Sequence, residues 1–253
     1  MFARHDLVWL SARGWRRARA AAPAHLRDAV DGWMRQDWPA IVRRADAGVP
    51  EDRLAVGIAL PPASDGAKGR IACSVAIEDV ESHVPPLRLA QVLAMAPHPW
   101  RRTLGALERQ AAMQGLVVRV FGSVAMQTLT ARPYLTAASD IDLLLHPASP
   151  AQLRRALDLL ASYAGMLPLD GEVVFPSGRA VAWKELAMAR DDPSRTRVLA
   201  KDIGGVSLQP ACALFAPHEG TVPVGLSPAF PSDAAQQKLG TVPKGQSPFP
   251  RHA

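Results

Sequence analysis

The chain has 253 residues, 48% of them hydrophobic, which is enough to bury one large core or two modest ones. No apolar run approaches the ~20 residues that cross a bilayer, and the run at residues 7–10 is too short for the core of a signal peptide, so we expect a cytoplasmic protein. The 29 basic and 23 acidic residues leave a net charge of +6, which suits a polyanionic cofactor or an acidic protein partner. Aromatic residues make up only 6%, and no nucleic-acid-binding signature lies among the arginines, so nucleic acid ranks below both.

The first 95 residues are expected to form an N-terminal accessory α/β domain. Two apolar runs, at residues 54–60 and 71–77, are typical of strands, and the Pro, Ser and Gly residues between them predict a hairpin. Residues 23–47 are expected to form a helix that ends near Gly48. The segment Pro97-His98-Pro99 then punctuates the chain, so we place the domain at residues 1–95.

Residues 96–216 are expected to form the second domain. The expected elements, in chain order, are a helix at 100–114, a strand at 116–121, a helix at 123–130, a strand at 140–146, a helix at 150–164 and a hairpin at 172–184, with further short elements to about 215. Because helices alternate with strands, this region predicts a mixed α/β sheet.

Residues 217–253 differ from the rest of the chain in being dense in Pro, Gly and Ser. The sequence Gly-Thr-Val-Pro occurs at 220–223 and again at 240–243, each time followed by Ser-Pro. The segment lacks helical or strand periodicity and holds too little apolar surface to offset its ordering entropy. We therefore expect a disordered tail.

Two carboxylates, Asp140 and Asp142, stand one residue apart at the start of the apolar run Asp-Ile-Asp-Leu-Leu-Leu. In a β-strand, side chains two residues apart project from the same face, so this pair offers a site for Mg²⁺. Gly122 and Ser123 follow the preceding apolar strand, and the backbone N–H groups and hydroxyl of such a turn suit phosphate oxygens. Each signal alone also fits a plain turn or a solvated strand edge. Their order along the chain favours metal-assisted transfer to or from a phosphate ester.

Three blocks carry a family resemblance: Arg4-His5-Asp6-Leu7-Val8-Trp9, residues 134–144 and residues 170–185. Over roughly residues 1–215 the chain resembles malonate decarboxylase holo-acyl-carrier-protein synthase, also called phosphoribosyl-dephospho-CoA transferase. The Gly-Ser and Asp-x-Asp motifs also resemble the signature of the nucleotidyltransferase superfamily related to DNA polymerase β. Here sixteen residues separate Ser123 from Asp140, a longer gap than the wider superfamily has.

The resemblance implies a nucleotidyltransferase-like catalytic domain that depends on Mg²⁺. The implied reaction moves the phosphoribosyl-dephospho-CoA group from 2′-(5″-triphosphoribosyl)-3′-dephospho-CoA to a serine of the malonate decarboxylase acyl carrier protein, and it releases pyrophosphate. In this interpretation Asp140 and Asp142 hold the metal, while Gly122 and Ser123 fix the oxygens of the leaving pyrophosphate. Lys201 is a further candidate for neutralising phosphate oxygens.

A third carboxylate is expected from a neighbouring strand, and Asp170 and Glu172 are the candidates. We favour Glu172 because it opens a predicted strand, which holds a side chain more rigidly than a loop does. The role that the superfamily implies for it is to position or deprotonate the attacking hydroxyl. Asp170 stays open as the alternative, and so does the role of Arg4, His5 and Asp6.

Two other functions fit the same residues. One is a different Mg²⁺-dependent nucleotidyltransferase, such as an adenylyltransferase that modifies a small molecule or a protein. The other is a non-catalytic module that keeps the fold and binds RNA or protein through its basic surface. Labelled ATP, the triphosphoribosyl donor and apo acyl carrier protein would together separate the three.

Overall fold

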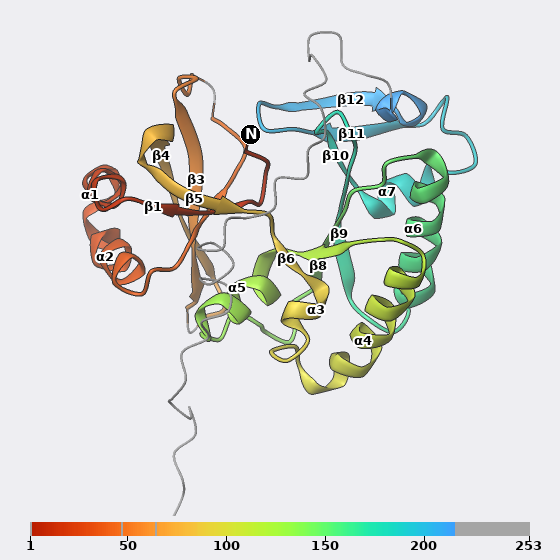
Figure 1. The fold of residues 1–253 in the computed structure, drawn as a ribbon, viewed down its shortest axis with the longest axis horizontal. Coiled ribbons are helices and arrows are strands. Elements are labelled where there is room, and N and C mark those ends of the chain that lie inside the picture. Colours follow the sequence, from red (N-terminus) through yellow and green to blue (C-terminus); the bar gives the residue numbers. More distant parts are fainter. Residues whose placement is uncertain (1, 47, 64, 216–253) are drawn as a thin grey trace, which may run out of the picture.

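The computed structural model describes residues 2–46, 48–63 and 65–215, and the tail expected at 217–253 lies outside them. Two sheets with their helices make up the described chain (Figure 1), which confirms the mixed α/β class. No helix in those three ranges is long and apolar enough to cross a membrane.

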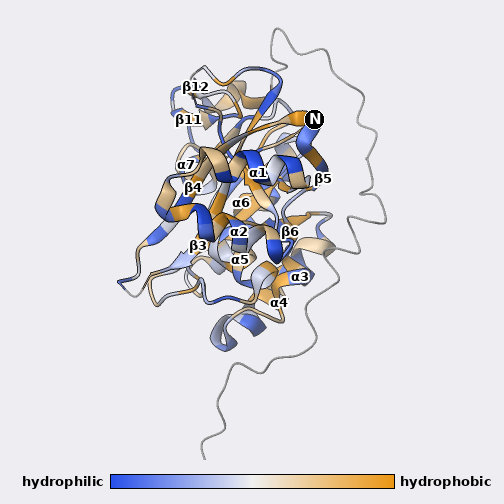
Figure 2. Ribbon diagram, turned by 90° about the vertical axis from the view of Figure 1, so that its left-hand side faces the viewer, coloured by the Kyte–Doolittle hydropathy of each residue, from blue (hydrophilic) through white to orange (hydrophobic). Residues whose placement is uncertain are grey.

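The first sheet is built from antiparallel pairs in the order β4-β3-β2-β1-β5. Its elements are β1 (Leu7–Leu10), α1 (Ala12–Ala21), α2 (Arg27–Arg35), β2 (Ala40–Val42), β3 (Arg53–Pro62), β4 (Lys68–Ala76) and β5 (Val80–Val84). The expected hairpin is confirmed as the β3–β4 pair, in which Ile58 lies opposite Ile71. Hydrophilic and hydrophobic stretches alternate on α1 (Figure 2), and its apolar side packs Trp15 into the same core as Trp33 of α2.

The helix expected at 23–47 is wrong beyond Arg35, where α2 ends. The next turn places Asp37 at a φ of +50°. Pro39 disfavours helical conformation in the residue before it. The chain then enters β2, which pairs with both β1 and β3. Strand pairing, a contact between distant segments, thus replaces the last turns of the expected helix.

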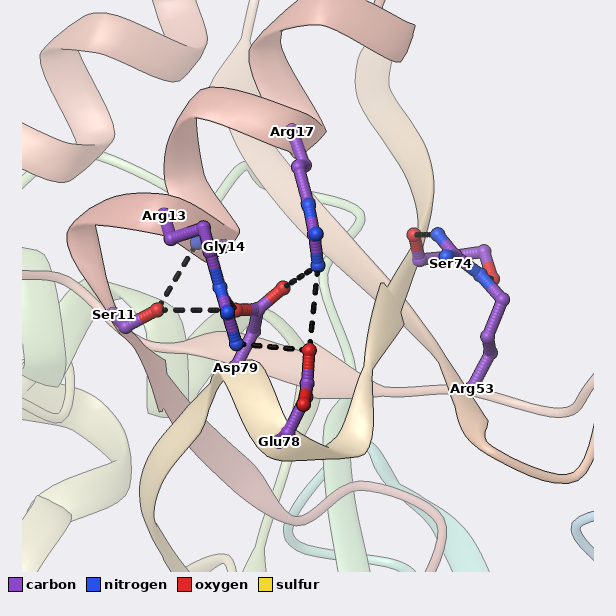
Figure 3. A network of polar contacts seen from close by, with 8 residues as sticks. All are labelled: Ser11, Arg13, Gly14, Arg17, Arg53, Ser74, Glu78 and Asp79. Atoms are coloured by element: carbon purple, nitrogen blue, oxygen red, sulfur yellow. Dashed lines mark hydrogen bonds and ion pairs between the residues drawn. The ribbon is translucent and has the colours of Figure 1, made fainter.

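A buried carboxylate fastens α1 to the turn that leads into β5. Asp79 is 0% exposed and accepts hydrogen bonds from Arg13 Nε at 2.6 Å and from Arg17 Nη1 at 2.8 Å (Figure 3). These hydrogen bonds, chiefly that from Arg13, hold the pKa of Asp79 below its ordinary value. Ser11 caps α1 by accepting a hydrogen bond from the backbone N–H of Gly14 at 3.1 Å. The network fixes the start of β5, which leads directly into the second sheet.

The second sheet has the order β12-β11-β10-β9-β8-β7-β6, with a parallel β8–β9 pair among antiparallel ones. Its strands are β6 (Leu87–Arg88), β7 (Val118–Val120), β8 (Ile141–Leu145), β9 (Leu169–Val174), β10 (Ala180–Ala182), β11 (Arg197–Lys201) and β12 (Val206–Pro210). The strands expected at 116–121 and 140–146 are confirmed as β7 and β8, and the hairpin expected at 172–184 as the β9–β10 pair. Because β6 precedes residue 95, the sheet includes chain from the expected accessory domain.

Helices flank the second sheet. They are α3 (Leu89–Val92), α4 (His98–Met113), α5 (Gly122–Thr130), α6 (Pro150–Tyr163) and α7 (Trp183–Met188). The expected helices at 100–114, 123–130 and 150–164 are confirmed as α4, α5 and α6. Figure 1 shows α4, α6 and α7 on the side of this sheet away from the first sheet, and α5 on the side toward it. Met126 of α5 packs into the core of the first sheet, so α5 joins the two halves.

The β8–β9 pairing depends on Gly171. The parallel register places Asp142 opposite Asp170. Gly171, the next residue of β9, has a φ of +124°, and a Cβ atom there would overlap the backbone of Leu143. Glycine alone suits both this conformation and this close approach. The place of Asp170 beside Asp142 therefore follows from the glycine next to it.

Gly171→Ala is expected to lower the free energy of unfolding by about 3 kcal/mol or more, because strain of about 1–3 kcal/mol at this φ adds to the backbone overlap. Gly178→Ala is the matched control. Gly178 also has a positive φ, +80°, but nothing lies within 4 Å of a Cβ atom there, so a loss of about 1–2 kcal/mol is expected. Urea denaturation followed by circular dichroism measures both. Equal losses would contradict the assigned role of Gly171.

Candidate active site

A cleft of about 640 Å³ lies between the two sheets. Residues of β2, β3 and β4 form one side, and residues at the ends of β7, β8 and β11 form the other. Six basic side chains face three carboxylates in its lining, and the basic ones are Arg4, Arg43, Arg44, Lys68, Arg70 and Lys201. An excess of positive charge in a cleft favours a polyanionic ligand.

Three aspartates gather at one end of this cleft, of which Asp140 and Asp142 line it and Asp170 lies beside them. Asp140 directly precedes β8, Asp142 lies within β8, and Asp170 lies opposite Asp142 on β9. One carboxylate oxygen from each lies within 4.8 Å of the other two. Hard divalent cations such as Mg²⁺ prefer carboxylate oxygens, so this donor set fits such an ion. The carboxylates of Asp140 and Asp142 lie close together, as their spacing predicted.

Burial, together with the neighbouring charges of Asp140 and Asp170, raises the pKa of Asp142 to about 6. Lys68 and Arg70 of β4 act in the opposite direction without cancelling the effect. The shift chiefly measures the cost of burying the Asp142 carboxylate, to which the two neighbouring negative charges add. A bound cation would offset that cost.

Gly122 and Ser123 open α5 beside this aspartate cluster. Gly122 has a φ of +67°, and a Cβ atom there would overlap Oδ2 of Asp142, so only glycine leaves space for that carboxylate. The backbone N–H of Phe121 donates to the carbonyl of Asp142 at 3.0 Å. The hydroxyl of Ser123 lies 3.0 Å from Nζ of Lys68, which reaches across from the first sheet. N–H groups at the start of a helix suit phosphate oxygens, so the turn has the chemistry that the sequence predicted.

Glu172 lies in a different environment, two register pairs further along β9. Its Oε1 accepts hydrogen bonds from Lys201 Nζ at 3.1 Å and Arg4 Nη2 at 3.3 Å, and its Oε2 lies 3.3 Å from His5 Nε2. Burial alone would raise the pKa of Glu172, but the hydrogen bond with His5 and the charges of Arg4 and Lys201 hold that pKa well below its usual range. Its carboxylate is therefore a weak base.

The structure thus groups Asp170, and not Glu172, with the two predicted metal ligands. The reason is strand register, since Asp170 faces Asp142 whereas Glu172 faces Leu144. This grouping favours Asp170, the alternative that the sequence left open, as the third carboxylate. Lys201, expected to bind phosphate, lines the cleft from β11 while it holds Glu172.

The segment Arg4-His5-Asp6 lies at the cleft, a position that its sequence did not predict. His5 has a φ of +72° and stacks on Phe121 with ring centroids 4.0 Å apart. Burial lowers the pKa of His5, although the hydrogen bond with Glu172 opposes this. Asp6 is buried and accepts a hydrogen bond from the backbone N–H of Ala3 at 2.9 Å, while burial raises its pKa to about 6. Arg4 and His5 therefore belong to the site, and Asp6 fixes the turn that presents them.

Lys68 and Arg70 are functional candidates that the sequence did not indicate. They lie on β4, some fifty residues before Gly122, and no local motif surrounds them. The sequence of β4 shows only that Lys68 and Arg70 share one face of a strand. Lys68 lies near Ser123 because the two sheets pack against each other.

Asp142→Asn is expected to stabilise the metal-free protein at pH 7.5 by about 1–3 kcal/mol. Folded Asp142 keeps its proton up to a pH of about 6, against 3.8 as the ordinary value, so its contribution to stability falls as the pH rises between these values. The gain should shrink at pH 4. Thermal unfolding at both pH values measures it, with Asp158→Asn on the exposed side of α6 as control. An unchanged or lower melting temperature for D142N at pH 7.5 would contradict the destabilisation assigned to the buried Asp142 carboxylate.

Comparisons with known proteins bear on the resemblance. The family model described as Phosphoribosyl-dephospho-CoA transferase MdcG N-terminal domain matches residues 3–86, and the one described as the MdcG C-terminal domain matches residues 88–211. A protein of Xanthomonas campestris pv. campestris (strain 8004) named phosphoribosyl-dephospho-CoA transferase is 37% identical over 222 residues, which are 85% of this chain and 97% of that protein. A protein of the same name from Bradyrhizobium diazoefficiens is 36% identical over 186 residues, 72% of this chain and 81% of its own.

No solved structure matches the chain, so the relation to DNA polymerase β stays a prediction. The family resemblance itself is confirmed, because the two family models together cover nearly all described residues. With relatives that match most of its length, the chain belongs to the phosphoribosyl-dephospho-CoA transferase family of enzymes.

Proposed function

We propose that this enzyme transfers phosphoribosyl-dephospho-CoA from 2′-(5″-triphosphoribosyl)-3′-dephospho-CoA to a serine of the malonate decarboxylase acyl carrier protein. One observation carries the proposal beyond the family name. Three aspartates, two of which line the cleft, lie beside the Gly122–Ser123 turn, and the cleft has an excess of basic side chains. That combination suits a divalent cation together with a ligand that bears several phosphates.

The proposed metal is Mg²⁺, held by Asp140, Asp142 and Asp170. The three oxygens within 4.8 Å and the raised pKa of Asp142 both favour a cation at this place. Bound there, Mg²⁺ would offset the negative charge that develops on the leaving pyrophosphate. Gly122 serves this site by leaving space for the Asp142 carboxylate.

The triphosphate of the donor is proposed to lie along the opening turn of α5. Backbone N–H groups at Gly122 and Ser123 would donate to its oxygens, as helix N-termini do for many phosphates. Lys68, already 3.0 Å from the Ser123 hydroxyl, would add a positive charge from the first sheet. Lys201 would add another from β11, on the other side of the cleft.

In the transfer step, the serine oxygen of the carrier protein attacks the phosphorus atom nearest the donor ribose. A phosphorus–oxygen bond to the carrier forms, the bond to the next phosphate breaks, and pyrophosphate leaves. The serine proton passes to Asp170, whose side chain is 43% exposed and so accessible to an incoming protein. The basic lining stabilises the pyrophosphate as its charge grows.

Asp140→Asn or Asp142→Asn is expected to slow transfer by at least ~10³, about 4 kcal/mol at ~1.4 kcal/mol per tenfold, because Asn keeps the shape and loses the charge that binds metal. Asp170→Asn is expected to slow it by about 10²–10⁴. Incorporation of labelled donor into apo acyl carrier protein measures the rate, with Asp158→Asn as control. Near-normal turnover of both D140N and D142N would overturn the metal site.

Labelled ATP tests the adenylyltransferase alternative in the same assay. We expect no label from ATP on the carrier protein or on the enzyme, because the donor's dephospho-CoA part supplies contacts that ATP lacks. Efficient labelling by ATP, with none from the triphosphoribosyl donor, would replace the proposed function by that alternative.

The carrier protein is expected to bind through charge. Acyl carrier proteins are typically acidic and this chain carries +6, so their encounter should be steered electrostatically. Raising salt from about 0.05 M to about 0.5 M should weaken carrier binding more than donor binding, because exposed charges are screened beyond ~10 Å. Surface plasmon resonance measures both. Undetectable carrier binding at low salt, with tight and steeply salt-dependent RNA binding, would favour the nucleic-acid module instead.

A further inference from the structure

We infer that Arg4 and Lys201, held in place by Glu172, form a second phosphate-binding site in the cleft, separate from the aspartate cluster. Glu172 is then a positioning residue and not the base that activates the acceptor. The identity of the phosphate rests on the proposed function, whereas the existence of the anion site does not.

Hydrogen bonds from two separate parts of the chain converge on Glu172. Arg4 comes from the segment before β1, and Lys201 from the end of β11. Each bonds Oε1, while Oε2 lies 3.3 Å from His5 Nε2 and 3.1 Å from Arg4 Nη1. Glu172 is only 7% exposed and does not line the cleft, whereas Arg4, His5 and Lys201 do. The carboxylate thus lies behind the cations and orients them toward the cleft.

The charges of this cluster do not cancel. Arg4 and Lys201 carry two positive charges against one on Glu172, which leaves +1 even with a neutral His5. Arg4 Nη1 is enclosed and lies 3.1 Å from Glu172 Oε2, so this ion pair fixes the guanidinium at the wall of the cleft. The remaining positive charge favours an anion in the cleft.

The site lies within reach of the metal cluster. Glu172 follows Asp170 by two residues on β9, a spacing of about 7 Å along a strand, and both side chains project from one face. A polyphosphate bound at the aspartates therefore extends to Arg4 and Lys201. The donor has two groups of this chemistry, its triphosphate and the diphosphate of its dephospho-CoA part.

Glu172 is poorly arranged to act as a base. Both of its oxygens already accept hydrogen bonds or contact a cation, and its side chain is 9% exposed against 43% for Asp170, so an incoming serine reaches it less easily. Removing its charge should therefore loosen Arg4 and Lys201 and leave the transfer step itself nearly intact.

The test measures binding without turnover. Calorimetry of the full chain with inorganic tripolyphosphate and, separately, with dephospho-CoA is carried out for Arg4→Met, Lys201→Met and Glu172→Gln. Arg190→Met, an exposed arginine paired with Asp158, is the control and should bind both probes normally. We expect each of the three variants to weaken one probe at least tenfold. Loss of tripolyphosphate binding assigns the site to the triphosphate, and loss of dephospho-CoA binding assigns it to the diphosphate.

Steady-state kinetics separate positioning from catalysis. E172Q should raise the donor KM about tenfold and lower kcat less than about threefold. A hundredfold or greater loss of turnover rate, at unchanged KM and unchanged probe binding, would overturn the inference and make Glu172 the base. Unchanged binding of both probes in R4M and K201M would overturn it as well, even if E172Q fails to fold. Weakened probe binding without any transfer to carrier protein would keep the anion site and reject the proposed function.

Discussion

The gathering of three carboxylates in a partly buried position is the constraint on which the rest of this structure depends. Asp140, Asp142 and Asp170 each place an oxygen within 4.8 Å of the others, and the raised pKa of Asp142 reflects first its burial and then the two neighbouring charges. The fold maintains the arrangement through two glycines, Gly171 beside Asp170 and Gly122 against Asp142, where any side chain would overlap its neighbour. A site that is unfavourable when empty and favourable with a cation is what metal-assisted chemistry requires.

The cleft exists only because the two sheets lie against each other. Lys68 of the first sheet reaches Ser123 of the second half, and Tyr134 donates to the carbonyl of Ala59 across the same boundary at 2.6 Å. Arg4, from the start of the chain, contacts Glu172. The basic side of the cleft thus comes largely from the N-terminal half and the acidic site from the other. The N-terminal half therefore supplies Arg4, Arg43, Arg44, Lys68 and Arg70 to the lining of the cleft.

Local patterns were enough to predict the helices and strands of the second half and the shared face of Asp140 and Asp142, since strand alternation is a property of neighbouring residues. The choice between Asp170 and Glu172 was not local. It depended on the β8–β9 register and on Arg4, which is 168 residues from Glu172 and has no signature linking the two. The prediction of a helix over 23–47 was wrong beyond Arg35 for the same reason. Residues 40–42 form β2, which pairs with the distant strands β1 and β3.

Titration of Mn²⁺, followed by electron paramagnetic resonance, tests the central claim that Asp140, Asp142 and Asp170 form the metal site. Mn²⁺ takes the same oxygen ligands as Mg²⁺ and reports binding without turnover. The account predicts that D142N and D170N lose the bound-ion signal, while E172Q keeps it. Loss of the signal in E172Q together with normal binding by D170N would contradict the account, and would return Glu172 to the metal site.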